Sequence, residues 1–242
     1  MHQDFLPPGI AVLTGAGISK ESGIDTFRDD GGLWTRVNLE EVATIDAWFR
    51  DKKKVLDFYN ETRRAFRSAD ITPNAAHEAL ARLEREYDGE VTIITQNIDP
   101  LHEMAGSRKV IHMHGRDGEV RCMACQTEFA SDVDLTPDSV CPNCRSIGEL
   151  RPNIVWFGEM PLEMERIYSA LGRCGLFLSI GTSGNVYPAA GFVQEARLAG
   201  ARTIELNLEP TDNQTLFHEH IYGPATQVVP PYVARILKQG WR

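Results

Sequence analysis

The sequence predicts an α/β fold, a Rossmann-like doubly wound parallel sheet with a smaller lobe. Short apolar runs recur along the chain, and each run ends in glycine or small polar residues. Segments with helical apolar spacing separate these runs, and two longer segments interrupt the alternation. Strands that alternate with helices are typical of parallel sheets, whose ligands bind beyond the carboxyl ends of the strands.

The first expected strand covers residues 10–14 and runs into the glycine turn Gly15-Ala16-Gly17. A helix is expected from Thr72, which suits an N-cap, with Pro73 in the first turn. Residues 91–95 are rich in β-branched side chains, which favour a strand. The remaining expected elements are strands over 176–180 and 203–206 and helices over about 189–199 and 232–238.

The two interrupting segments are residues 32–68, with helical spacing and many aromatic side chains, and residues 120–150, with four cysteines. Both look like insertions between sheet elements, so we expect them to form one small lobe together. The chain is then a single domain over 1–242. Its Rossmann-like core would consist of 1–31, 69–119 and 151–242, and its small lobe of the two insertions.

The four cysteines form two pairs, Cys122-x-x-Cys125 and Cys141-x-x-Cys144, with fifteen residues between the pairs. This spacing is typical of a Zn²⁺ ion held tetrahedrally by four thiolates. Four cysteine ligands leave no open position for water, so the pattern predicts one structural zinc rather than a catalytic one. The fifth cysteine, Cys174, has no neighbouring partner, and we expect a half-buried thiol at a helix end rather than a nucleophile.

Composition and charge argue against some classes of partner. The chain has 242 residues, with 25 Lys and Arg against 34 Asp and Glu, so its formal charge is −9. Nonspecific nucleic-acid binding needs a basic surface, so no nucleic-acid partner is expected. No apolar run approaches the roughly 20 residues of a membrane span, and the N-terminus lacks the features of a secretory signal. Thiols free to hold zinc suit a reducing cytoplasm, so we expect a cytoplasmic location.

The glycine turn begins like a dinucleotide-binding fingerprint, but Lys20 stands where the third glycine would be. Alone, this piece is compatible with a plain turn. The longer segment is specific: Gly15-Ala16-Gly17-Ile18-Ser19-Lys20-Glu21-Ser22-Gly23-Ile24-Asp25-Thr26-Phe27-Arg28. It resembles the first signature of the sirtuin family, NAD⁺-dependent protein deacylases, and within that family the bacterial proteins of class III. Further segments match in the family's order: Thr95-Gln96-Asn97-Ile98-Asp99, His114-Gly115, Ile154-Val155-Trp156-Phe157-Gly158-Glu159, Gly181-Thr182-Ser183 and Asn207-Leu208-Glu209.

The resemblance covers essentially the whole chain and implies an NAD⁺ site. Arg28 would put a cation beside the cofactor phosphates, although a surface arginine paired with a carboxylate is the alternative. Ser19 and the turn amides could bind phosphate oxygens, helped by the N-terminus of the following helix. The implied cofactor-binding set is Gly15, Ala16, Gly17, Ile18, Ser19, Thr26, Phe27, Arg28, Trp34, Gln96, Asn97, Ile98, Asp99, Gly181, Thr182, Ser183, Asn207, Leu208, Glu209 and Ala225.

Asn97 and Asp99 follow a strand, so both can lie at the ligand edge of the sheet. The resemblance places Asp99 at the nicotinamide carboxamide and Asn97 near the adjoining ribose. Asp99 could also cap the next helix, and the two roles can coexist. Pro100 departs from the Asn or Gly usual in the family, which leaves the exact placement of Asp99 open.

Three histidines compete for the role of general base: His102, His112 and His114. An unperturbed imidazole has a pKa of about 6.5, so it can accept a proton near neutrality. His112 and His114 would face the same way in an extended segment, so spacing alone does not choose between them. The His-Gly match to the family identifies His114, and the implied catalytic set is His114, Asn97 and Asp99.

The resemblance implies removal of acyl groups from protein lysines. The acyl-lysine would enter a tunnel lined by Val155, Trp156 and Phe157, for which a plain buried strand is the alternative. His114 would deprotonate a ribose hydroxyl, and the products would be free lysine, nicotinamide and O-acyl-ADP-ribose. The peptide would lie extended between the lobes and add strand-like hydrogen bonds. Alternatives are a protein mono-ADP-ribosyltransferase and a non-catalytic NAD-sensing module.

Some sirtuins prefer succinyl or malonyl groups and carry a small alanine followed by Tyr-x-x-Arg on a helix. Ala43 and Tyr59 match this pattern, but Thr62 stands in place of the arginine. Arg63 follows, yet one residue rotates a side chain by about 100° around a helix. We therefore expect a roomy pocket that still deacetylates, with weakened desuccinylation.

Overall fold

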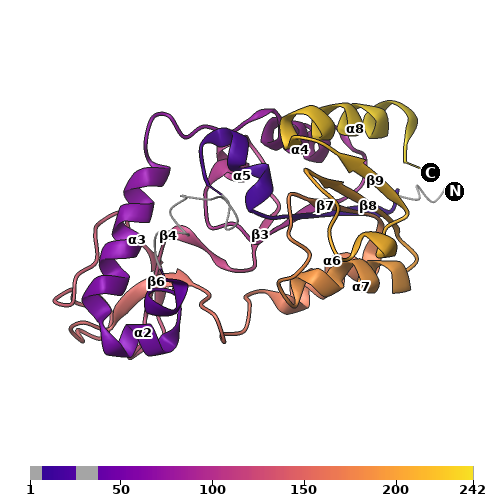
Figure 1. The fold of residues 1–242 in the computed structure, drawn as a ribbon. Coiled ribbons are helices and arrows are strands. Elements are labelled where there is room, and N and C mark those ends of the chain that lie inside the picture. The colour runs from indigo at the N-terminus through magenta and orange to yellow at the C-terminus, as the bar shows by residue number, and fades with distance from the viewer. Residues whose placement is uncertain (1–6, 26–37, 242) are drawn as a thin grey trace, which may run out of the picture.

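The computed structural model describes residues 7–25 and 38–241 (Figure 1). Its main sheet has six parallel strands in the order β3-β2-β1-β7-β8-β9. Strands are added outward from β1 on one side and outward from β7 on the other, so the strand order reverses between these two parallel strands. The predicted fold class is confirmed. The strands are β1 (Gly9–Thr14), β2 (Val91–Thr95), β3 (Val110–His112), β7 (Cys174–Ile180), β8 (Arg202–Asn207) and β9 (Glu219–Tyr222).

Helices cover both faces of this sheet (Figure 1). On one face, Ile10 and Val12 pack with residues of α4 (Ala75–Glu86) and α8 (Ala225–Gln239). On the other face, Ala11 and Leu13 pack with residues of α6 (Met164–Arg173) and α7 (Phe192–Leu198). Because successive side chains of a strand point to opposite faces, β1 is buried on both sides. In β1 the one polar residue, Thr14, therefore stands at the end of the strand.

The smaller lobe combines the two insertions. Its antiparallel sheet consists of β4 (Gly115–Cys122), β5 (Glu128–Ala130) and β6 (Leu150–Ile154). Helices α2 (Ile45–Arg50) and α3 (Lys52–Phe66) pack beside it. One buried apolar cluster joins the helices to the cysteine-bearing segment, and it includes Trp48, Leu56, Tyr59, Val120, Cys122, Leu135, Cys141, Leu150 and Trp156.

Two helix boundaries differ from the sequence prediction. Helix α4 begins at Ala75 rather than just after Thr72, because the side chain of Asn74 accepts the amide of Ala76 and serves as the N-cap. Helix α8 begins at Ala225 and not at residue 232, although it contains Pro230 and Pro231. Apolar packing of α8 against the sheet outweighs the backbone bonds that these prolines cannot make.

The segment after β1 also differs. It continues as two 3-10 turns, Ala16–Ile18 and Lys20–Ser22, and not as an α-helix. The predicted help from an α-helix N-terminus at the phosphates is therefore wrong for residues 16–22. The other short elements are a 3-10 turn at Leu39–Glu41, α5 (Leu101–Met104), and 3-10 turns at Ala189–Gly191 and Gln214–Leu216.

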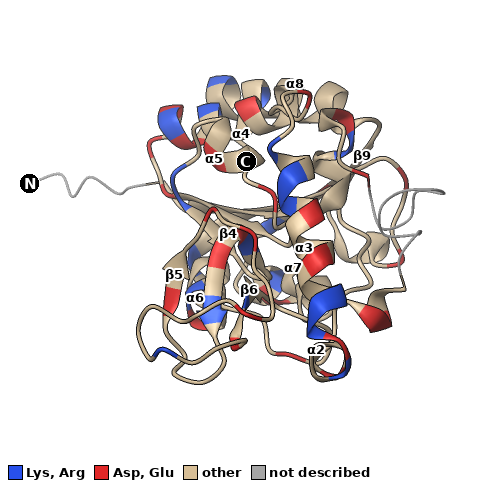
Figure 2. Cartoon of the chain, turned by 90° about the vertical axis from the view of Figure 1, so that its left-hand side faces the viewer, with Lys and Arg blue, Asp and Glu red and all other residues tan. Residues whose placement is uncertain are grey.

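Acidic and basic positions are interspersed over the helices of both lobes (Figure 2). Several oppositely charged side chains pair one helical turn apart, as Lys53 does with Asp57 and Arg82 with Glu86. Within the described ranges, none of the helices has the length and apolar character needed to cross a bilayer.

Candidate active site and zinc centre

Two glycine loops meet at the carboxyl edge of the sheet, between β1 and β7. The amide of Gly15 donates to the carbonyl of Ile180 at 3.1 Å, and that of Gly17 donates to the carbonyl of Gly181 at 2.9 Å. A Cβ at Gly17 would lie 2.7 Å from the Cα of Gly181, which is closer than real contacts allow. Backbone packing between the two loops therefore requires glycine here, in addition to any role at a phosphate.

Ser19 joins two of the predicted catalytic residues. Its hydroxyl donates to Oδ2 of Asp99 at 3.0 Å and accepts from Nδ2 of Asn97 at 3.1 Å. Asn97 also donates to the carbonyl of Gly15 at 3.2 Å. All three side chains are buried, so residues from the ends of β1 and β2 form one polar group beside the glycine loops.

Asp99 has a second bond that the sequence anticipated. Its Oδ1 accepts from the amide of Leu101 at 3.1 Å, at the start of α5. Pro100 precedes Leu101, and its missing N–H removes no bond of this helix. Burial raises the pKa of Asp99 above its usual value, while the bonds from Leu101 and Ser19 oppose that rise.

The structure separates the three candidate histidines. In His112, Nδ1 lies 3.3 Å from the carbonyl of Asn97 and Nε2 lies 2.7 Å from Oε1 of Glu103, so both nitrogens are engaged. His102 is buried with Nε2 on the hydroxyl of Thr14 at 2.9 Å.

His114 differs from His112 because only its Nδ1 is bonded, to the carbonyl of Gln96 at 3.0 Å, among the residues that the structure describes. His102 also has one nitrogen without a partner, Nδ1, but that atom is buried, whereas the side chain of His114 is partly exposed. With Nδ1 as the donor, Nε2 carries the lone pair that a general base needs. Burial lowers the pKa of His114, and the bond to Gln96 opposes that shift. The geometry therefore favours His114 over its two competitors.

The predicted tunnel residues lie beside His114. The amide of Val155 donates to the carbonyl of His114 at 2.9 Å, and the amide of Phe157 donates to the carbonyl of Ala43 at 3.0 Å. The indole of Trp156, buried between them, donates to the hydroxyl of Tyr59 at 2.9 Å. This segment thus links the segment of His114 to the helical insertion, and brings together all the predicted tunnel residues with Ala43 and Tyr59.

Thr62 lies one turn after Tyr59 on α3 and is buried. Its hydroxyl donates to the carbonyl of Phe58 at 3.0 Å, one turn earlier in the helix. Arg63 is held elsewhere: it pairs with Asp117 at 3.3 Å and donates to the carbonyl of Val133. Arg63 is therefore unavailable to replace the missing arginine at position 62.

The remaining predicted cofactor residues lie along the same sheet edge. Asn207 donates to the carbonyl of Thr182 at 2.8 Å, which ties the end of β8 to the loop after β7. Glu21 accepts from the amide and hydroxyl of Thr226, which places Ala225 and the start of α8 beside the turns after β1. Leu208 and Glu209 follow Asn207. The predictions for Thr26, Phe27, Arg28 and Trp34 lie outside the described residues.

The four predicted zinc ligands come together at one point. All four sulfurs lie within 4.8 Å of one another, with Cys122 and Cys144 at 3.7 Å and Cys125 and Cys141 at 3.8 Å. A tetrahedron with Zn–S bonds of about 2.3 Å has edges of about 3.8 Å. None of the four forms a disulfide. The cluster fits one structural zinc ion without further ligands.

Sequence reasoning missed two buried groups next to the site. His77 of α4 lies 3.5 Å from the Ser19 hydroxyl, and its ring centroid lies 5.0 Å from that of His102. Arg151 of β6 stacks on Trp156, with its guanidinium carbon 3.2 Å from the ring centroid, and pairs with Glu159 at 2.7 Å. Arg151 lies in a strand whose burial is seen only in the structure, so no signal in the sequence could have found it.

Comparison with known proteins gives the family. The model of the Sir2 family matches residues 15–188, which include both glycine loops, the zinc cluster and His114. The chain belongs to the Sir2 family. The chain is 53% identical over 233 residues to the NAD-dependent protein deacylase SIR2rp3 of Leishmania major, covering 95% of this chain and 96% of that protein. It is 52% identical over 231 residues to the NAD-dependent protein deacylase of Escherichia coli K12, covering 96% and 83% of the two chains.

Solved Sir2 structures have the same fold. A mutant of a Sir2 homologue in complex with ADP-ribose superposes with a TM-score of 0.86 at 38% identity, covering 95% of this chain and 92% of that one. A Sir2 homologue in complex with NAD superposes with a TM-score of 0.84 at 37% identity, covering 95% and 91%. These matches extend the Sir2 likeness over both lobes of the chain.

Proposed function

We propose that this Sir2 protein is an NAD⁺-dependent protein-lysine deacylase. The observation that carries the proposal is the position of His114, which has one ring nitrogen bonded and the other available as a base. It lies between the polar group around Ser19 and the segment from Val155 to Phe157. Transfer of an acyl group to a ribose hydroxyl needs such a base between a nucleotide and an acyl-lysine. The relatives named above carry the name of this activity.

Each residue of the site would have a separate role in the reaction. NAD⁺, when bound, supplies the ribose that receives the acyl group. The Asp99 carboxyl would accept a hydrogen bond from the nicotinamide carboxamide, and Asn97 would hold the adjoining ribose or a water. Nε2 of His114 would take the proton of a ribose hydroxyl. Because burial lowers the pKa of His114, its imidazole is neutral at pH 7 and able to do so.

The cofactor would lie along the carboxyl edge of the sheet. The glycine loops, Ser19 and Gln96 would face its nicotinamide half, while Thr182, Ser183 and the residues from Asn207 to Glu209 would hold the adenosine half. Polar side chains at the ends of β1, β2, β7 and β8 support this placement, because open parallel sheets bind ligands at that edge. The roles of Thr26, Phe27, Arg28 and Trp34 stay predictions.

The protein substrate would bind as an extended peptide between the two lobes, with no nucleic-acid or membrane partner. Phe157 supports this: its backbone pairs with the segment of Ala43, while its side chain is exposed. An exposed side chain beside a strand-like segment suits addition of a further strand.

Four thiols free to hold zinc support a cytoplasmic location. The single domain would divide into a Rossmann-like core of residues 1–31, 69–119 and 151–242 and a small lobe of residues 32–68 and 120–150.

The acyl pocket would accept acetyl-lysine better than succinyl-lysine. Ala43 leaves room, and Tyr59 is held by Trp156. The position that would bind a distal carboxylate carries Thr62, whose hydroxyl is occupied by the carbonyl of Phe58. Arg63 is committed to Asp117 and Val133. A bidentate guanidinium–carboxylate contact is therefore missing, which weakens recognition of acidic acyl groups.

The test is mass spectrometry of acetyl-lysine peptide turnover with and without NAD⁺. We expect free lysine peptide, nicotinamide and O-acetyl-ADP-ribose in equal amounts, and none of them without NAD⁺. His114→Ala should lower kcat by about 10² or more, whereas His112→Gln should retain a working base. Full activity of His114→Ala would refute the assignment of the base. ADP-ribosylated peptide in place of O-acetyl-ADP-ribose would favour the transferase alternative.

A further inference from the structure

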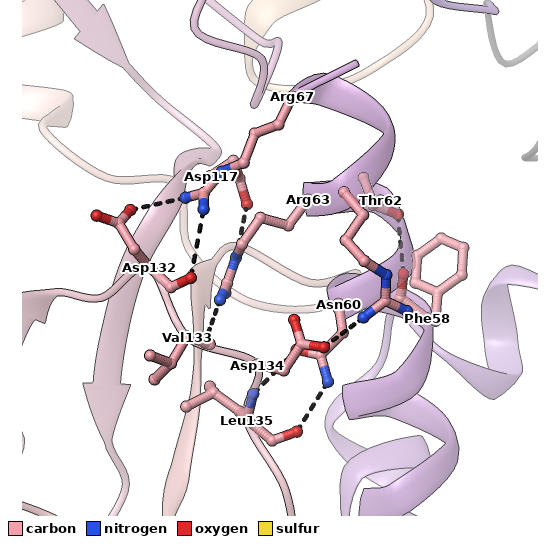
Figure 3. A network of polar contacts seen from close by, with 11 residues as sticks. Phe58, Asn60, Thr62, Arg63, Arg67, Asp117, Asp132, Val133, Asp134 and Leu135 are labelled. Atoms are coloured by element: carbon pink, nitrogen blue, oxygen red, sulfur yellow. Dashed lines mark hydrogen bonds and ion pairs between the residues drawn. The ribbon is translucent and has the colours of Figure 1, made fainter.

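One face of α3 presents four polar side chains to the segment between β5 and the second cysteine pair. Asn60, Arg63 and Arg64 of α3 and its C-cap residue Arg67 follow the i, i+3, i+4, i+7 spacing of a single helix face. Figure 3 shows the side chains of Asn60, Arg63 and Arg67 reaching across to residues 132–135 and to Asp117. Arg64 contacts Asp134 in the same segment. The helix and this segment are therefore joined by a row of polar contacts.

These contacts differ in burial. Arg64 and Arg67 pair with Asp134 and Asp132, and their side chains are 57% and 45% exposed. Arg63 is only 2% exposed, and its partner Asp117 is 12% exposed. Exposed ion pairs contribute little, whereas a buried pair is held firmly because either charge alone would be left without water. Arg63 is therefore the arginine whose contacts fix the position of α3 relative to Asp117 and Val133.

Asn60 determines the register of the contact. Its Nδ2 donates to the carbonyl of Leu135 at 2.8 Å, and its Oδ1 accepts from the amide of Leu135 at 3.0 Å. Arg63, one turn later, adds a bond to the carbonyl of Val133. Together they prevent α3 from sliding or rotating relative to the zinc-bearing segment.

Asp117 extends the connection to the cofactor loop. It lies three residues after His114, and its amide donates to the carbonyl of Ile98 at 2.8 Å. Ile98 stands between Asn97 and Asp99, the two residues bound to Ser19. Arg63 is thus connected, through its ion pair with Asp117, to the segment of His114 and to the loop that carries Asn97 and Asp99.

We propose that Arg63 is a positioning residue, which holds the acyl-lysine wall of α3 at a set distance from His114 and the cofactor loop. Tyr59 lies one turn before Arg63 on the same face, and Thr62 lies next to it. The inference rests on the proposed function, because it assumes that Tyr59 and Thr62 line the acyl pocket. A guanidinium is needed because its fork reaches Asp117 and Val133 at once, which a lysine ammonium on a flexible stem does not do.

The test compares three substitutions on one helix: Arg63→Met, with Arg64→Met and Arg67→Met as matched controls. Steady-state kinetics would be measured with acetyl-lysine peptide and NAD⁺ varied separately. For Arg63→Met we expect kcat/KM for the peptide to fall roughly tenfold or more, because a misplacement of about 1 Å can cost 10². KM for NAD⁺ should change by less than about twofold. Both controls should stay within about twofold in every parameter.

A merely structural Arg63 would lower the melting temperature without shifting the peptide parameters relative to those for NAD⁺. Such a result would overturn the inference. Arg63→Lys keeps the charge and is the milder variant should Arg63→Met not fold. We expect about a threefold loss in peptide kcat/KM for it, and an unchanged value in folded Arg63→Lys would also overturn the inference.

The partner is tested by a double-mutant cycle with Asp117→Asn. If the two residues act as a unit, the double variant should lose no more peptide kcat/KM than Arg63→Met alone. Fully additive losses would contradict the pairing. A wild-type chain without NAD⁺-dependent deacylation would overturn the proposed function and this inference together. An active wild type with an unaffected Arg63→Met would overturn this inference alone.

Discussion

Mild acid should destabilise this protein through two buried histidines beside the active site. Burial lowers the pKa of His77 to about 4 and, with a smaller contribution from His77, that of His102 to about 3. Their rings are in edge-to-face contact, with centroids 5.0 Å apart. Both are neutral in the folded protein at pH 7, and neither has a carboxylate within hydrogen-bond distance in the described structure.

The sign follows from where the protons bind. An unfolded histidine titrates near 6.5, so above that pH both states are neutral and there is no penalty. As the pH falls below 6.5 the unfolded chain takes up protons that the folded chain refuses, and stability is lost. The loss is complete only below the folded pKa values of about 4 for His77 and 3 for His102. Between about pH 7.5 and 5, each histidine should cost about 2 kcal/mol, and the pair about 4 kcal/mol.

The assay is urea unfolding at several pH values from 7.5 to 5, for the wild type and His77→Gln. Nδ1 of His77 accepts the amide of Asn74 as part of a capping box, and glutamine at this position can keep that bond without titrating. The variant should lose about 2 kcal/mol less than the wild type over this range. Subtracting the two curves removes the contribution of the carboxylates. Parallel curves would refute the reasoning, because they would mean that His77 titrates alike in both states.

Four further predictions follow from the same contacts. Removal of zinc by a strong chelator should unfold the small lobe, since Cys122 and Cys141 belong to its core; retained circular dichroism and activity after zinc loss would contradict this. The acid limb of kcat/KM should be centred below pH 6.5, because burial lowers the pKa of His114; a limb at or above 6.5 would identify another group. Gly17→Ala should lower the free energy of unfolding by about 1–3 kcal/mol, because the added Cβ would meet the Cα of Gly181. The control Gly172→Ala, where the added Cβ meets open space, should not lower it, and equal effects of the two variants in urea unfolding would count against the packing argument. Thr62→Arg should raise kcat/KM on succinyl-lysine peptides about tenfold relative to acetyl-lysine peptides, and an unchanged ratio would remove position 62 from acyl selection.

Local chemistry explains why so much was predictable from the sequence. A strand buried on both faces is a short uninterrupted apolar run, so the strands around Val12, Ile93 and Leu178 were found where they are. The zinc cluster was predictable for a similar reason: each CxxC turn aims two sulfurs at one point, and only the meeting of the two pairs needed the fold. The sirtuin motifs carried the family and the candidate site.

Contacts between distant segments decided the rest. His112 and His114 are two residues apart, so in an extended segment both side chains would face the same way. Only the contacts of His112 with Glu103 and with the carbonyl of Asn97 show that both of its ring nitrogens are hydrogen-bonded. The start of α8 depended on apolar packing that outweighs its prolines. Three arginines on α3 look alike in the sequence. Which of them is buried depends on Asp117, more than fifty residues away, because burial and charge pairing are properties of the space around a side chain and not of its neighbours along the chain.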